Sequence, residues 1–116
     1  MKLITAIIRA EKLDEVIEAL MDHRVHGLTV TEVRGFGRQF GQPVPGACLD
    51  LGLPQRPALL PKVRLDLVAP DDSADALAEV VAKHARTAVI GDGKIWVSDV
   101  VSVLRVRTGD RDLGAL

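Results

Sequence analysis

The sequence predicts an α+β domain in which a strand–helix–strand unit occurs twice. Two observations predict the units: apolar runs typical of β-strands lie at residues 3–9 and 62–68, and each is followed by apolar residues at helical spacing. A third observation is a proline- and glycine-rich stretch at about residues 37–61, which predicts a long loop between the two units.

The first unit begins with a strand at residues 3–9, where β-favouring residues are frequent. The next apolar positions recur at i, i+3, i+4, i+7 and i+8, which is one face of a helix. These positions are Leu13, Val16, Ile17, Leu20 and Met21. His26 and Gly27 end the helical pattern, and mostly alternating apolar residues at 28–33 predict the second strand.

The loop at about 37–61 contains five prolines, which break any long helix or central strand. A loop of this length inside a compact domain is uncommon and is usually functional or disordered. It also carries five leucines: Leu49, Leu51, Leu53, Leu59 and Leu60. We therefore expect it to dock on a partner or on its own oligomer.

The second unit repeats the first. Residues 62–68 alternate as a strand, and Asp71 and Asp72 are better interpreted as a helix N-terminus than as a catalytic acid pair. The apolar face of this helix comprises Ala74, Leu77, Val80, Val81 and His84. Residues 87–93 are predicted to form a loop, 94–97 a strand, and 103–106 a short final strand.

Two such units commonly form one antiparallel sheet with both helices on one face, the ferredoxin-like arrangement. The other face of the sheet is then left open. Because 116 residues bury only a modest core, we expect other copies of the chain to cover that face.

Length and composition limit the possible functions. The 116 residues fit a single domain, 1–116, and the net charge of −1 with 3% aromatic residues argues against nucleic acid as a partner. No apolar run approaches the roughly 20 residues of a membrane span, and no signal peptide is evident, so we expect a cytoplasmic protein that is not embedded in a membrane. Cys48 is the only cysteine, which excludes an internal disulfide.

The segment 91–94 (GDGK) places two glycines and a lysine directly before a strand. Glycines let backbone N–H groups approach an anion closely, and lysine supplies a positive charge. Arg105 and Arg107 point the same way from an extended chain, so the two segments together could hold phosphates. Taken alone, 91–94 is a simple turn entering a strand, and it lacks the spacing of a P-loop.

The three histidines do not predict a metal site. His23 and His26 lie where the first helix ends, which favours a helix-end or surface role. His84 lies on an apolar helical face and is interpreted as a core or interface residue.

Several segments, in this order, resemble the PII signal-transduction proteins, which are small trimeric sensors of nitrogen, carbon and energy state. The matching segments are residues 12–16 (KLDEV), 27–33 (GLTVTEV), 35–39 (GFGRQ), 60–63 (LPKV), Thr87 with 91–96 (GDGKIW), and 105–109 (RVRTG). The resemblance runs from residue 1 to about residue 109.

The resemblance implies a compact homotrimer with a long exposed loop, binding three adenine nucleotides (ATP, ADP or AMP) in the clefts between subunits. Segment 91–94 of one subunit then surrounds the phosphates, and the neighbouring subunit supplies the two arginines of 105–107. The residues implied to contact the nucleotide are Thr29, Gly37, Arg38, Gln39, Val68, Gly91, Asp92, Gly93, Lys94, Arg105 and Arg107. Among them, Thr29 and the backbone near Val68 hold the adenine end.

The resemblance also implies a second effector. Gln39 helps to complete a site for Mg²⁺ bound to ATP, to which 2-oxoglutarate adds its carboxylates. Lys62 is implied to pair with the negative charge of 2-oxoglutarate, and Arg9 is implied to bind the same effector. Bicarbonate is an alternative anion for this pocket.

The chain departs from the family pattern at three places. It contains no tyrosine and no serine within the long loop, so the usual covalent modifications of that loop cannot occur. The family's glycine and lysine after the threonine are replaced by Ala88 and Val89, which removes a positive charge near the phosphates. This replacement predicts that the binding of triphosphate, relative to diphosphate or monophosphate, is weaker than in a typical member of the family. Asp66 stands where the family normally has a glutamate near the cleft.

The leading functional hypothesis is a regulatory sensor rather than an enzyme, acting through its long loop on a membrane transporter or a metabolic enzyme. One alternative is a specialised sensor of ADP or AMP and bicarbonate, linked to inorganic-carbon uptake or carboxysomes. A rival of another class is a slow nucleotide phosphatase, for which Asp92 is the nearest general base. A further alternative is a trimer that has lost its ligands.

Overall fold

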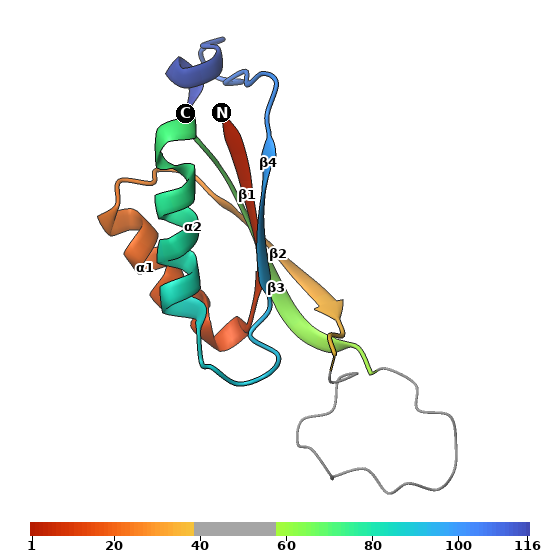
Figure 1. Ribbon diagram of the computed structural model, residues 1–116. Coiled ribbons are helices and arrows are strands. Elements are labelled where there is room, and N and C mark those ends of the chain that lie inside the picture. The colour runs from red at the N-terminus through yellow and green to blue at the C-terminus, as the bar shows by residue number, and fades with distance from the viewer. Residues whose placement is uncertain (39–57) are drawn as a thin grey trace, which may run out of the picture.

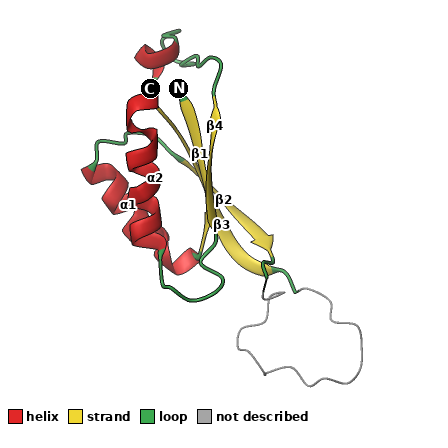
Figure 2. Cartoon of the chain, in the orientation of Figure 1, coloured by secondary structure: helices red, strands yellow, loops and turns green. Residues whose placement is uncertain are grey.

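The computed structural model of the chain describes residues 1–38 and 58–116. In this part of the chain, a four-stranded antiparallel sheet carries both α-helices on one face (Figure 1). The elements are β1 (Lys2–Ile8), α1 (Leu13–Asp22), β2 (Thr29–Gly35), β3 (Leu60–Ala69), α2 (Asp71–Ala85) and β4 (Lys94–Asp99), with short 3₁₀ turns at Ala10–Lys12 and Asp112–Ala115. Figure 2 shows the same arrangement by type of element.

The strand order is β2-β3-β1-β4, and each neighbouring pair is antiparallel. Ile4 of β1 lies opposite Leu67 of β3 on one side and opposite Val97 of β4 on the other. This order and the shared helical face confirm the predicted ferredoxin-like α+β fold.

The core lies between the sheet and the helices because alternate residues of β1 and β3 point toward the helices. The buried residues from the strands are Ile4, Ala6, Ile8, Val63, Leu65 and Leu67, and those from the helices include Val16, Leu20, Leu77 and Val81. The intervening residues point to the uncovered face of the sheet. On that face, Trp96 is 42% exposed.

Met21 corrects the predicted apolar face of α1, because it is exposed rather than buried. The buried residues of α1 are Val16, Ala19 and Leu20. At 100° per residue, Met21 lies about 140° around the helix from Val16, so it points away from the core.

The predicted final strand at 103–106 is wrong. Within the described residues, the segment contributes only one isolated bridge, between Leu104 and Arg111. Val103 and Arg105 form backbone hydrogen bonds with Asp112 and Asp110, so the segment turns back on itself rather than joining the sheet.

His23 lies at the end of α1, as the sequence indicates, whereas His84 is only partly buried and does not belong to the core. His23 follows the last turn of α1, and its Nδ1 lies 2.8 Å from the carbonyl oxygen of Ala19. His84 of α2 faces α1, with its Nδ1 3.3 Å from Glu15. No helix of the described residues is long and apolar enough to cross a membrane.

Candidate functional site

The loop between α2 and β4, residues 87–93, is folded around one carboxylate. We call it the glycine loop. The Oδ2 atom of Asp92 accepts hydrogen bonds from the backbone N–H groups of Thr87 (2.8 Å) and Ala88 (2.9 Å). Its Oδ1 atom accepts a bond from the Thr87 hydroxyl and another from Arg9 Nε, at 3.1 Å. Asp92 therefore holds both ends of the loop together and fixes Arg9 beside it.

Burial would raise the pKa of Asp92, but hydrogen bonds from Thr87, Arg9 and Ala88 outweigh burial and lower this pKa from 3.8 to about 2. A carboxylate with these partners is ionised at neutral pH and is a poor proton acceptor.

Asp92 should make the stability of the protein depend on acid pH. Because its pKa is depressed in the folded chain, its contribution is fully present above about pH 4 and is lost as pH falls toward 2. The free energies of unfolding of the wild type and of Asp92→Asn, measured by denaturant titration from pH 2 to 6, should converge over this window. A difference that stays constant with pH would contradict this prediction.

Two cationic side chains, Arg9 and Lys62, donate hydrogen bonds to backbone carbonyl groups of the glycine loop from the ends of neighbouring strands. Arg9, just after β1, donates through Nη2 to the carbonyl oxygen of Ile90 at 2.9 Å. Lys62 of β3 donates to the carbonyl oxygen of Gly91 at 2.6 Å. Burial, followed by the charge of Arg9, lowers the pKa of Lys62. Arg9 and Lys62, two of the three residues predicted to bind an effector, therefore lie together against the loop predicted to bind phosphates.

The backbone conformation of the loop explains its glycines. Gly91 and Gly93 have φ angles of 104° and 98°, which side chains other than glycine rarely adopt. At Gly93, a Cβ atom would lie 1.7 Å from the carbonyl oxygen of Ile7. The loop can therefore pass this close to β1 only with glycine at position 93.

Ala88 has the left-handed conformation too, with φ at 64°. This conformation costs an alanine about 1–2 kcal/mol. Glycine avoids this cost, but it also loses more conformational entropy on folding, which offsets part of the gain. Ala88→Gly should therefore raise the free energy of unfolding by about 0.5–1 kcal/mol. Ala82→Gly, within α2, is the matched control and should lower it by about 1 kcal/mol. Denaturant titration measures both, and destabilisation by Ala88→Gly would refute the strain at this position.

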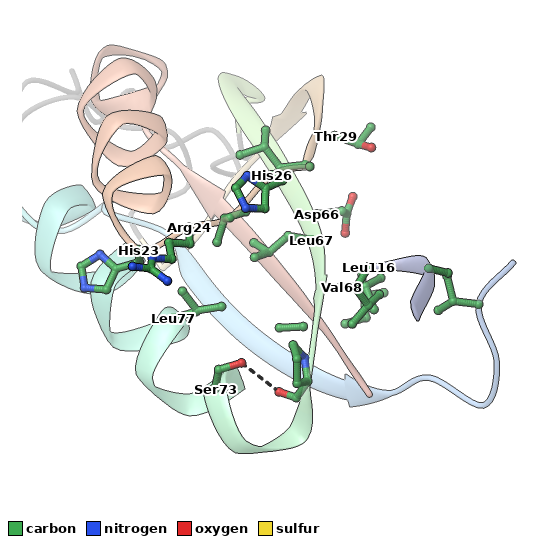
Figure 3. Close-up of a pocket in the computed structure, with 18 of the residues that line it drawn as sticks. His23, Arg24, His26, Thr29, Asp66, Leu67, Val68, Ser73, Leu77 and Leu116 are labelled. Atoms are coloured by element: carbon green, nitrogen blue, oxygen red, sulfur yellow. Dashed lines mark hydrogen bonds between the residues drawn. The ribbon is translucent and has the colours of Figure 1, made fainter. Parts of the chain in front are cut away.

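A second region lies at the other end of β3, where a groove of about 1000 Å³ follows the edge of the strand (Figure 3). Thr29, Asp66 and Val68 line the groove on the uncovered face of the sheet, and Leu67 points the opposite way, toward Leu77 of α2. The groove also extends to the C-terminal segment, through Val103, Arg105, Ala115 and Leu116.

The edge of β3 is free in this groove because β2 begins late. The pairing of β2 with β3 starts at Thr29 opposite Asp66, whereas residues 67–69 of β3 pair only with β1 among the described residues. A free strand edge offers backbone donors and acceptors, which can recognise the polar edge of a planar base.

Asp66 is anchored by its neighbours on the uncovered face. Arg64 Nε donates to Asp66 Oδ2 at 2.9 Å, and the buried hydroxyl of Thr5 donates to Oδ1 at 2.7 Å. The bonds from Arg64 and Thr5 hold the pKa of Asp66 below its usual value despite partial burial. Asp66 therefore presents an oriented negative charge beside Thr29.

Arg105 enters the same groove and is held by its own segment. Its Nη1 atom is 3.2 Å from Asp110 Oδ2, and its Nη2 donates to the carbonyl oxygen of Leu116 at 3.1 Å. Arg107 is exposed.

One chain does not bring the glycine loop and Arg105 together. The glycine loop precedes the start of β4, where Lys94 lies opposite Ile7, whereas the 105–107 segment follows the other end, where Asp99 lies opposite Lys2. These ends are about 17 Å apart, given the rise per residue of a strand. Figure 1 shows the glycine loop and the C-terminal segment at opposite ends of the molecule.

The remaining predicted site residues lie at the base of the long loop. Gly37 and Arg38 are exposed just after β2, at the limit of the described residues, and Gln39 lies outside them. The predicted role of Gln39 in a Mg²⁺ site is therefore still a prediction. Within residues 1–38 and 58–116, no cluster of three or more His, Cys, Asp or Glu residues could hold a metal ion.

Two carboxylates organise these regions, and sequence reasoning named only one of them. Asp92 was predicted as a nucleotide contact, whereas its carboxylate is directed to Thr87, Ala88 and Arg9. Asp110 was not singled out. Its place just after the RVRTG segment gave no signal that it would pair with Arg105.

Comparison with known proteins identifies close relatives. The family model described as "Nitrogen regulatory protein P-II" matches residues 1–110. The chain is 47% identical to Nitrogen regulatory protein GlnK of Escherichia coli (strain K12), over all 116 residues and the full length of both chains. It has the same identity and coverage with Nitrogen regulatory protein P-II 1 of E. coli K12 and of Salmonella typhimurium.

Proposed function

Because this chain belongs to the P-II family of nitrogen regulatory proteins, we propose that it is a homotrimeric regulator that binds an adenine nucleotide between subunits. The glycine loop of one subunit surrounds the phosphates, and Arg105 and Arg107 of the next subunit close on them. The observation that carries this proposal is the division of the candidate site: one chain holds its two cationic parts at opposite ends of β4.

The chemistry of each part suits the ligand. Lys94 and the open backbone around Gly91 and Gly93 offer the donors that phosphate needs. Arginine adds paired planar donors from the other subunit. The free edge of β3 at residues 67–69, beside Thr29, suits the adenine base.

Exposed apolar side chains support assembly with other copies. Val101 and Val106 are 96% and 97% exposed, and Trp96 lies on the uncovered face of the sheet. A monomer seldom leaves so many large apolar groups in water, so we propose that neighbouring subunits cover them.

A second anion acts at the base of the long loop. Lys62 and Arg9 converge on the glycine loop there, so a carboxylate such as 2-oxoglutarate, or bicarbonate, would exchange bonds with them when it binds. Binding of this anion then changes the long loop, which engages a membrane transporter or a metabolic enzyme. The long loop lacks the tyrosine and serine that are usual in the family. This difference also suits the specialised alternative, a sensor of ADP or AMP and bicarbonate in inorganic-carbon uptake.

The arrangement favours a regulator over a slow nucleotide phosphatase. Asp92 is the nearest candidate base, yet its four hydrogen bonds and its pKa of about 2 suit a structural role. Steady ATP turnover that disappears in Lys94→Ala would reverse this preference.

Calorimetric titration with ATP, ADP and AMP, each with and without 2-oxoglutarate and bicarbonate, tests the proposal. We expect binding of ADP or AMP at least as tight as binding of ATP, because Val89 supplies no charge near the outer phosphate. No binding of any adenine nucleotide would refute the proposed function. Much tighter binding of ATP, with strong synergy from 2-oxoglutarate, would refute the nucleotide preference alone.

A further inference from the structure

We propose that Asp110 is a positioning residue, which holds Arg105 in the groove so that its free donors face the phosphates of a bound nucleotide. This inference rests on the proposed function. Asp110 is half-exposed and does not line the groove, so it acts through Arg105 rather than on the ligand.

The contacts between the two residues form a closed turn. The backbone N–H of Arg105 donates to the carbonyl oxygen of Asp110, and the N–H of Gly109 donates to that of Arg105, both at 2.9 Å. The Asp110 carboxylate pairs with Arg105 Nη1 at 3.2 Å and accepts a bond from the Thr108 hydroxyl at 2.7 Å. The backbone and the side chain of Arg105 are thus fixed by the same six-residue turn, residues 105–110.

The turn matters because this segment belongs to no strand of the sheet. In the described part of the chain, residues 100–111 follow the end of β4 and are otherwise held by an isolated bridge between Leu104 and Arg111 and by hydrogen bonds that join Val100 to Met1 and Val103 to Asp112. A long arginine side chain on such a segment would otherwise sample many rotamers, and a ligand would have to immobilise it.

The Asp110 carboxylate and the Leu116 carbonyl oxygen each accept one hydrogen bond from the Arg105 guanidinium group, which has five N–H donors in all. The remaining N–H groups can donate hydrogen bonds to phosphate oxygens without release of Asp110. The geometry therefore favours preorganisation of Arg105 over competition between Asp110 and the ligand.

A double-mutant cycle on ADP affinity tests this role, with Arg105→Ala, Asp110→Ala and the double variant measured by calorimetry in the full-length protein. Asp110→Ala alone should weaken ADP binding about two- to tenfold, the range expected for ordering one long side chain. In the Arg105→Ala background, the same change should have no further effect. Asp99→Ala is the control, since it also removes one exposed acid and one ion pair, with Lys2, outside the groove.

Three other outcomes would overturn the role of Asp110. Equal weakening in both backgrounds would show that Asp110 supports the segment independently of Arg105, and tighter ADP binding by Asp110→Ala would show competition; either overturns the inference. The same holds if Asp110→Ala binds ADP as the wild type does. If the wild type itself binds no ADP, the proposed function fails and this inference fails with it.

Discussion

Replacing Gly93 with alanine should disrupt the glycine loop, lower the free energy of unfolding by about 3 kcal/mol or more, and abolish detectable ADP binding. The new Cβ atom would lie 1.7 Å from the carbonyl oxygen of Ile7 and 2.7 Å from its carbonyl carbon. Both are backbone atoms of β1, so no side-chain rotation can relieve the overlap. The φ angle of 98° adds strain for any residue with a side chain. Denaturant titration and calorimetry with ADP measure the two effects.

Gly35→Ala provides the control for this substitution. Gly35 ends β2, and a Cβ atom there would meet nothing within 4 Å. Its effect on the free energy of unfolding should stay within about 1 kcal/mol. If Gly93→Ala were as stable as Gly35→Ala, the close approach of the loop to β1 would be wrong.

Arg105→Ala should weaken ADP binding about 10- to 100-fold, because it removes the charge-assisted hydrogen bond to phosphate that we propose for this arginine. Stability should change little, since Arg105 and Asp110 form a partly exposed pair of small net value. Calorimetry and thermal unfolding separate the two effects.

Arg111→Ala is the matched control for Arg105→Ala. Arg111 is an exposed arginine of the same segment and does not line the groove, so its loss should leave ADP binding within about twofold of the wild type. Equal weakening by the two substitutions would point to a general charge effect rather than a specific contact.

The sequence predicted the fold well because periodicity is strong in its central elements. The alternation in β3 reflects a real division of faces, with Val63, Leu65 and Leu67 against the helices and Lys62, Arg64 and Asp66 on the uncovered face. The final strand at 103–106 was predicted wrongly because alternation alone cannot say whether an extended segment pairs with a sheet or with itself. The contacts with Asp110 and Asp112 that decide this are not apolar, so they leave no periodic signal.

The candidate site was predictable in its residue types but not in its contacts. The glycines before β4 predicted a close approach of the backbone to an anion, whereas the structure shows that Gly93 is needed for the close approach of the loop to Ile7 of β1. The Asp92 side chain points into the loop and accepts hydrogen bonds from the backbone N–H groups of Thr87 and Ala88. Ala88 has a positive φ angle, and no residue pattern reveals this backbone conformation.

We propose that each nucleotide site combines the glycine loop of one subunit with Arg105 of another. Co-expression of Lys94→Ala and Arg105→Ala chains in equal amounts tests it most directly, with calorimetry counting the high-affinity ADP sites in the mixed oligomers. Each variant alone should lack such sites, whereas random mixing should restore about one quarter of the wild-type number, since some interfaces then join an intact loop to an intact arginine. If the mixture binds no more ADP than the two variants measured separately, each site is built within one chain or not at all, and the proposed site between subunits is wrong.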